Sequence, residues 1–179
     1  VIGDTGDSPM SSILKVDTIQ NTGGTTGLTI DSSGRALQPA KPSFFAHRLG
    51  QGVQTLNTLT FTLAQFNQVD HNIGGHYNAS TYKFTCPVSG VYHFDVWLYI
   101  YPTQQAEARF YINDSTRYRF ASVQAAASDA NPHGAGGGVT VQLNANDTVS
   151  VYAFANSASN IYGGSGNERA SMFSGYLIG

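Results

Sequence analysis

The chain has 179 residues, of which 11% are charged and 12% aromatic, and its formal net charge is −2. Soluble domains carry about 25% charged residues, so the polar character here comes mainly from uncharged side chains. The chain lacks the basic footprint of nucleic-acid-binding proteins, and no apolar run approaches the ~18 residues that span a membrane. We therefore expect no nucleic-acid partner and no membrane insertion.

Cysteine usage and the N-terminus restrict the class further. Cys86 is the only cysteine, which excludes an internal disulfide framework and a cysteine-rich zinc site. Its apolar surroundings at Phe84 and Pro87 predict a buried, inert thiol. The N-terminus shows no basic and apolar leader of the secretory kind, so we expect any external location to be reached by another route.

The first 42 residues differ in character from the remainder. Residues 1–9 are small, acidic and aperiodic, which predicts an extended arm. Residues 10–42 contain two short apolar runs around a turn and end in a Pro-rich linker. Two such strands cannot form an independent sheet, so we expect a segment that trimerises or docks on a partner. The apolar residues expected in this role are Ile13, Leu14, Val16, Ile19, Leu28 and Ile30.

From residue 43 to residue 179, short β-branched and aromatic runs alternate with Gly, Asn, Asp and Pro turns. The predicted strands are 44–49, 58–63, 82–85, 91–101, 108–112, 118–123, 138–143, 148–154 and 171–178. Apolar and polar residues alternate most clearly within 139–143 and 149–154. The pattern predicts an all-β fold, namely a jelly-roll β-sandwich of about ten strands behind a short β or extended N-terminal segment.

One ordered spacing of residues leads to a known family. Its members are Phe66, Asn72, Tyr77, Phe84 and Gly90, and it closes with the run Gly-Val-Tyr-His-Phe at 90–94. This spacing resembles the signature of the globular domain of the C1q and tumour-necrosis-factor superfamily. The closing run at 171–178 strengthens the resemblance, which covers residues 43–179. Val96 departs from the signature, which usually has Phe or Tyr at that position.

The resemblance implies a homotrimer, because members of the superfamily associate through apolar surfaces near a three-fold axis. Alternation along 90–101 places Tyr92 and Phe94 on one strand face and His93 and Asp95 on the other. One face can therefore fill the core while the other contacts a partner. The residues expected either in the core or in the trimer interface are Tyr92, Phe94, Phe154, Phe173 and Tyr176.

Residues 13–35 resemble the N-terminal lead-in of bacteriophage tail-fibre and virion structural proteins. This resemblance implies a virion location, with residues 1–42 contacting other virion proteins and the C1q-like head recognising a host surface glycan or protein. We interpret the chain as a homotrimeric tail-fibre or fibre-tip protein. A capsid-decorating head fibre and a secreted cellular C1q-like recognition protein are the alternatives.

Binding residues are expected in polar loops, because loops on a rigid scaffold commonly carry function. Such loops are predicted at 104–106, 125–137 and 156–167, and the glycines between 134 and 138 are interpreted as part of a flexible loop. The ligand-binding candidates are Gln104, Gln105, His133, Asn156, Asn160, Tyr162 and Asn167. Solvated loops without a ligand are the alternative.

The one candidate metal site consists of Asp70, His71 and His76, which lie within seven residues of each other. They offer oxygen and imidazole ligands for calcium or a transition metal. No Asp-rich calcium loop accompanies them, so we expect no cofactor, with calcium the one candidate. The sequence contains no nucleophile elbow, phosphate loop or dinucleotide fingerprint. We therefore expect no catalytic residues and no enzyme.

Overall fold

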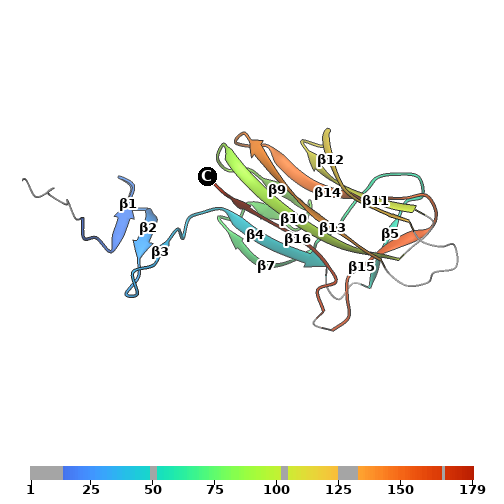
Figure 1. The fold of residues 1–179 in the computed structure, drawn as a ribbon, viewed down its shortest axis with the longest axis horizontal. Coiled ribbons are helices and arrows are strands. Elements are labelled where there is room, and N and C mark those ends of the chain that lie inside the picture. Colours follow the sequence, from blue (N-terminus) through green and yellow to red (C-terminus); the bar gives the residue numbers. More distant parts are fainter. Residues whose placement is uncertain (1–13, 49–51, 102–104, 125–132, 167) are drawn as a thin grey trace, which may run out of the picture. The chain divides into compact units, whose positions relative to one another are not determined.

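The computed structural model describes residues 14–48, 52–101, 105–124, 133–166 and 168–179. Residues 1–40 and residues 41–179 form two compact units. Within the described residues the regular structure consists of sixteen strands in three sheets (Figure 1). The all-β prediction is confirmed, whereas the predicted segments 1–9, 10–42 and 43–179 stay predictions.

The first unit is an antiparallel sheet with turns built from polar side chains. Its strands are β1 (Thr18–Gln20), β2 (Thr26–Ile30) and β3 (Ala36–Leu37). Asn21 Oδ1 accepts hydrogen bonds from the backbone N–H groups of Gly23 and Thr25, which closes the first turn. The two predicted strands thus find a third within their own chain, and β3 is too short to show alternation in the sequence.

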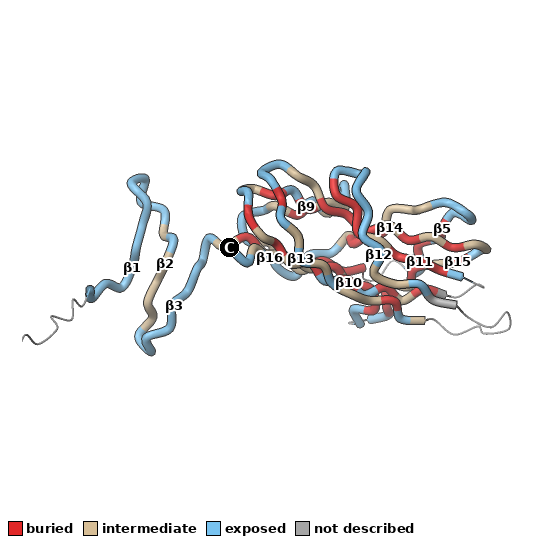
Figure 2. Tube along the Cα trace, turned by 45° about the horizontal axis from the view of Figure 1, so that its top comes forward, coloured by how far each residue is buried: buried red, intermediate tan, exposed pale blue. Residues whose placement is uncertain are grey.

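Apolar residues of the first unit remain accessible to solvent. Leu14 is 79% exposed and Ile19 47% exposed, while Leu28 and Ile30 are half-buried. Figure 2 shows no buried residue on β1, β2 or β3. The unit therefore has no core of its own in the described residues, and its trimerising or docking role stays a prediction. Ile13 lies outside the described residues.

The second unit is a sandwich of two sheets. The larger sheet contains, in spatial order, β5 (Val53–Leu56), β15 (Ser159–Tyr162), β10 (Gly90–Tyr101), β16 (Ser171–Leu177), β4 (Ser43–Arg48) and β7 (Gln68–Ile73), with β13 (His133–Leu143) paired along β10. The smaller sheet contains β12 (Thr116–Gln124), β11 (Gln105–Ile112), β14 (Thr148–Ala155), β9 (Lys83–Thr85) and β8 (Tyr77–Asn78), with β6 (Thr62–Leu63) paired to β14.

Aromatic rings from both sheets form the core between them. Phe173 on β16 lies 4.9 Å from Phe44 on β4 and 6.1 Å from Phe110 on β11, measured between ring centroids. Phe84 on β9 lies 5.5 Å from Phe94 on β10. Rings at these separations gain edge and stacking contacts beyond simple burial. Cys86 is fully buried, as predicted.

Two features of the second unit differ from the prediction. Strands β5, β7, β8 and β15 were not predicted, because their sequences are polar or too short to alternate. The predicted glycine-rich loop is wrong, because residues 133–143 form the long strand β13. Hydrogen bonding to β10 along eleven residue pairs overcomes the low β-propensity of glycine.

Candidate functional site

The outward side of the larger sheet carries several aromatic side chains and Met172. Along β10, every second residue from Tyr92 to Ile100 is buried, so the residues between them point away from the core. Directly paired residues share a face, which brings outward residues of β4, β16 and β10 into rows. We call this surface the aromatic face, and its members are Phe45, His93, Trp97, Tyr99, Met172 and Tyr176.

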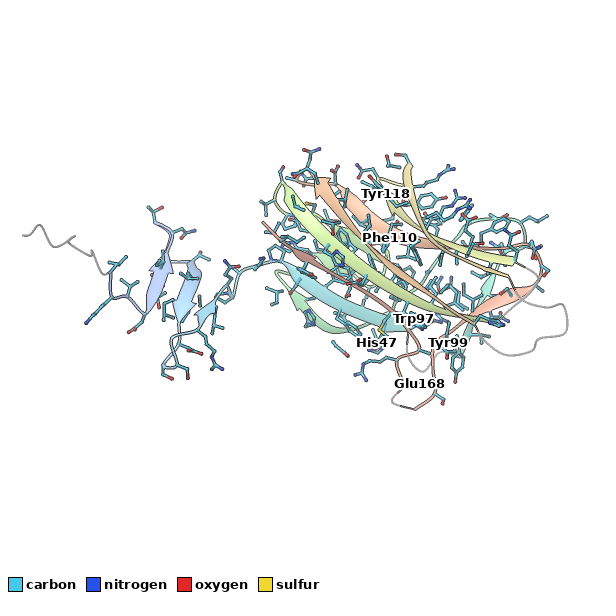
Figure 3. All side chains as sticks on the ribbon, viewed as in Figure 1. His47, Trp97, Tyr99, Phe110, Tyr118 and Glu168 are labelled. Atoms are coloured by element: carbon cyan, nitrogen blue, oxygen red, sulfur yellow. The ribbon has the colours of Figure 1, made fainter. Side chains whose placement is uncertain are left out.

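The largest exposed rings of the aromatic face are Trp97, 42% exposed, and Tyr176, 46% exposed. Figure 3 shows Trp97 and Tyr99 close together on β10, and their ring centroids are 6.5 Å apart. A fully hydrated patch of large rings is costly in a monomer, and such patches mark interaction sites. The arrangement can therefore bury a partner surface.

Strand β13 makes room for Trp97 by presenting bare backbone. Gly136 pairs with Trp97, and Gly134 pairs with Tyr99. A methyl group at Gly136 would lie 2.2 Å from Trp97 Cε3, and one at Gly134 would lie 2.3 Å from its Cζ2. The indole ring therefore lies on the backbone of β13, an approach that only glycine permits.

Polar groups on the same side of the sheet are paired within the chain. His93 Nδ1 lies 2.8 Å from Thr140 Oγ1, and His93 Nε2 lies 3.1 Å from Asp95 Oδ2. The ring of His93 lies 5.6 Å from that of Tyr176. Burial of a polar group costs less free energy when the group already has a hydrogen-bond partner. These contacts therefore allow a partner to cover the aromatic face.

At the edge of the larger sheet, one carboxylate joins three elements. Arg169 donates from Nε and Nη2 to Asp70 at 2.7 and 3.2 Å, and His47 Nε2 lies 3.1 Å from Asp70 Oδ1. The hydrogen bond from Arg169 holds the pKa of Asp70 below its ordinary value, and the hydrogen bond to His47 lowers it further. His47 is buried, and within the described residues its Nδ1 has no hydrogen-bond partner.

The predicted core or interface residues divide among three places. Tyr92, Phe94 and Phe173 are fully buried in the sandwich core. Tyr176 lies on the aromatic face. Phe154 is half-buried on the outer side of the smaller sheet, where its ring lies 5.2 Å from Phe61. The sequence does not separate these outcomes, because all five are aromatic residues in strands.

Sequence reasoning missed the centre of the aromatic face. Trp97, Tyr99, Phe45 and Met172 were not predicted as contact residues. The alternation already recognised at His93 and Asp95 continues to Trp97 and Tyr99, so extending it would have found both. Phe45 and Met172 could not be found in this way, because only strand pairing places Met172 opposite Trp97 and Phe45 opposite Ser174 in the neighbouring row.

The ligand-binding candidates lie mainly on strands rather than in loops, which corrects their predicted placement. His133 begins β13, Asn160 and Tyr162 lie on β15, and Gln105 begins β11. Asn156 Oδ1 accepts a hydrogen bond of 2.9 Å from the backbone N–H of Gln105. Pairing of β13 and β15 with the last residues of β10 brings His133 and Asn160 to that end of the sandwich. Gln104 and Asn167 lie outside the described residues.

The metal-site candidates are held by separate contacts. Asp70 is engaged by Arg169, the ring of His71 stacks 6.5 Å from that of Phe45, and the ring of His76 lies 6.4 Å from that of Phe84. The described residues contain no group of three His, Cys, Asp or Glu side chains arranged to hold a metal ion. A calcium site here stays a prediction. No helix in the described part of the chain is long and apolar enough to cross a membrane.

Solved structures share this fold at low sequence identity. The globular domain of zebrafish complement 1qA aligns with a TM-score of 0.62 and 20% identity, covering 78% of this chain and 98% of that one. The Eiger TNF of S. frugiperda aligns with a TM-score of 0.59 and 10% identity, covering 78% and 94%. Murine APRIL aligns with a TM-score of 0.55 and 8% identity, covering 77% and 99%. The predicted jelly-roll fold is thus confirmed.

Curated relatives are more similar to this chain in sequence. Rat complement C1q tumor necrosis factor-related protein 5 is 33% identical over 113 residues, which are 63% of this chain and 44% of the relative, and the human protein of that name matches equally. The chain thus spans less than half the length of these relatives. The C1q domain profile matches residues 44–178, so the chain belongs to the C1q domain family.

Proposed function

We propose that this chain is a homotrimeric recognition head in which the aromatic face forms the contact between three copies. The observation that carries the proposal is the exposure of Trp97 and Tyr176 on the outward side of the larger sheet of an otherwise well-packed sandwich. Family resemblance supports three copies rather than two. Interfaces of this kind derive most of their energy from a few central aromatic residues, and Trp and Tyr are the commonest of these.

The trimer is tested by sedimentation velocity of the full chain and of the variant Trp97→Ala/Tyr176→Ala. Loss of each central ring should raise the dissociation constant by about 30-fold or more, because each hot-spot residue contributes about 2 kcal/mol or more. Tyr118→Ala is the matched control, since Tyr118 is 38% exposed but lies on β12 of the smaller sheet (Figure 3). A monomeric wild type at micromolar concentration, or an unchanged trimer in the double variant, would refute the proposal.

Recognition, rather than catalysis, is the proposed activity of the head. The polar residues that gather at the end of β10, among them His133 and Asn160, offer adaptable hydrogen bonds, and three copies would add avidity. Glycoside hydrolysis would instead need two carboxylates flanking a cleft, at about 5 to 9.5 Å from each other. Incubation with cell-surface polysaccharide and assay of reducing ends checks this, and turnover would overturn the non-enzymatic assignment.

Of the two biological settings, a secreted cellular C1q-like protein is better supported than a virion fibre. The relatives at 33% identity are rat and human proteins. The virion interpretation, whether a tail fibre or a capsid fibre, depends on residues 13–35 alone, and no comparison bears on it. Antibody labelling of purified phage particles against assay of culture medium separates the two settings.

A further inference from the structure

The outer side of the smaller sheet carries three arginines. Along β11, Ala106, Ala108, Phe110 and Ile112 are buried, so the residues between them point outward. The directly paired residues of β12 share that outward side. Arg119 pairs with Arg109, and Arg117 pairs with Tyr111, which places Arg109, Arg117 and Arg119 together. We call this surface the arginine face.

Aromatic rings beneath two of these guanidinium groups hold them in place. The Cζ atom of Arg109 lies 4.4 Å from the centroid of Phe61, and that of Arg117 lies 5.4 Å from the centroid of Tyr111. Stacking uses the flat face of a guanidinium group and leaves its N–H edge free to form paired hydrogen bonds with an oxyanion. Because the rings restrict the side chains in advance, less entropy is lost when a ligand binds.

The arginine face has an excess of positive charge. Glu107 accepts from Nε of Arg109, and the same oxygen lies 3.1 Å from Nε of Arg119. Among the described residues, Arg117 has no carboxylate within ion-pair distance. Three arginines facing one carboxylate leave two positive charges, whereas the whole chain carries −2. Arg109 and Arg119 are paired directly across the strands, where like charges repel, and Glu107 offsets this repulsion because its carboxylate contacts both.

The geometry points to the arginine face as a binding surface for an acidic polysaccharide, whose carboxylate or sulfate groups would be held by Arg117 and Arg119. The face is an extended sheet surface on which the Cα atoms of Arg117 and Arg119 lie about 7 Å apart along β12, so a repeating anionic polymer matches it better than a single small anion. This inference rests on the proposed recognition function and names the partner class. It does not depend on the trimer, because all the residues belong to one chain.

Other polyanions fit this surface less well. Non-specific nucleic-acid binding uses open aromatic platforms for base stacking, but the rings of Phe61 and Tyr111 each have one face covered by a guanidinium group. Binding to anionic lipid requires clusters of about four to eight basic residues, whereas this face has three. An alternative role for the arginines is protection of the sheet edge. Strand β12 is an edge strand, and charges on an edge strand prevent pairing with other chains.

The inference is tested with the full chain by biolayer interferometry at 50 and 300 mM NaCl. The probes are polygalacturonate for carboxylates, heparin for sulfates, neutral dextran and oligo-dT. We expect binding to at least one acidic polysaccharide, not to dextran, and weakening at high salt because exposed charges are screened. Arg117→Gln should weaken binding about 10-fold, as expected for loss of hydrogen bonds to a charged group. Arg117→Lys should weaken binding less than Arg117→Gln does, because lysine keeps the charge but lacks the planar guanidinium group that forms paired hydrogen bonds.

Arg35→Gln is the matched control, because Arg35 is also an exposed arginine but lies in the first unit. It should change affinity less than twofold. Equal binding by wild type and Arg117→Gln/Arg119→Gln would refute the site, and tighter binding of oligo-dT than of either polysaccharide would refute the partner class. Self-association of the double variant, with no polyanion binding by wild type, would assign the arginines to edge protection instead. Sedimentation of the same samples measures the oligomeric state, so it shows whether the proposed trimer has formed independently of polyanion binding.

Discussion

At the scale of single residues, Asp70 shows how the second unit ties distant segments together. Its carboxylate receives two hydrogen bonds from Arg169 and contacts buried His47, so it joins β7, β4 and the segment before β16. A group whose pKa is lower in the folded chain than in the unfolded chain stabilises the fold above its unfolded pKa of about 4. That stabilisation is lost as the pH falls through the folded pKa.

We predict that Arg169→Gln moves the pKa of Asp70 back toward its ordinary value, because the principal cause of the lowering is removed. The variant should be less stable than wild type at pH 6, and the difference should be smaller at pH 3, because the pH has then fallen below the unfolded pKa of about 4 toward the lowered folded pKa of Asp70. Urea unfolding at the two pH values and NMR titration of the carboxyl group measure this. Arg35→Gln, which contacts Asp31 instead, should leave the Asp70 titration unchanged. A constant stability difference across the pH range would contradict the assignment.

At the scale of elements, β10 and β13 form a pair of long strands. On their outward side, glycines of β13 lie opposite the large side chains of β10. Glycines weaken an isolated strand, yet β13 is paired with β10 along its entire length. The pairing makes use of the missing side chains, because Trp97 occupies the space that they leave. The aromatic face therefore depends on both strands, although only β10 supplies its rings at this position.

We predict that Gly136→Ala lifts the indole ring of Trp97 off β13 and destabilises the chain by about 1 to 3 kcal/mol, the usual cost of overpacking. Trp97 is the only tryptophan, so a red shift of intrinsic fluorescence reports its displacement directly. Gly27→Ala is the control, because a methyl group there would have its nearest neighbour at 3.9 Å. Unchanged emission of Gly136→Ala would mean that the ring does not lie on this strand in solution.

At the scale of the whole molecule, the two units differ in what stabilises them. Every residue of the aromatic core lies between Phe44 and Phe173, whereas the first unit exposes most of its apolar side chains. Hydrophobic burial supplies most of the folding free energy of a domain, so the second unit has the means to fold by itself.

Residues 41–179 expressed alone should accordingly keep the thermal midpoint of the second unit and its trimeric state, because the aromatic face lies within them. Differential scanning calorimetry and sedimentation velocity of the two proteins make the comparison. If the shorter chain were monomeric while the full chain was trimeric, residues 10–42 would hold the trimer together, as the sequence alone suggested. A lower thermal midpoint in an intact trimer would show that the first unit stabilises the head.

The sequence by itself determined the fold and the family. Period-two alternation, turn residues and the ordered spacing from Phe66 to Gly90 depend on local geometry, which a linear pattern records. Even so, aromatic identity did not tell core from surface, because Phe173 and Tyr176 differ only in which side of β16 they occupy.

Only the tertiary structure decided the two candidate surfaces. The aromatic face requires β4, β16, β10 and β13, whose residues lie up to about 130 positions apart, and strand order rather than sequence order makes them neighbours. The glycines of β13 were misinterpreted for the same reason, since their meaning depends on Trp97 in another strand. Register between paired strands is a property of the folded sheet, and it places Arg117 over Tyr111 as well.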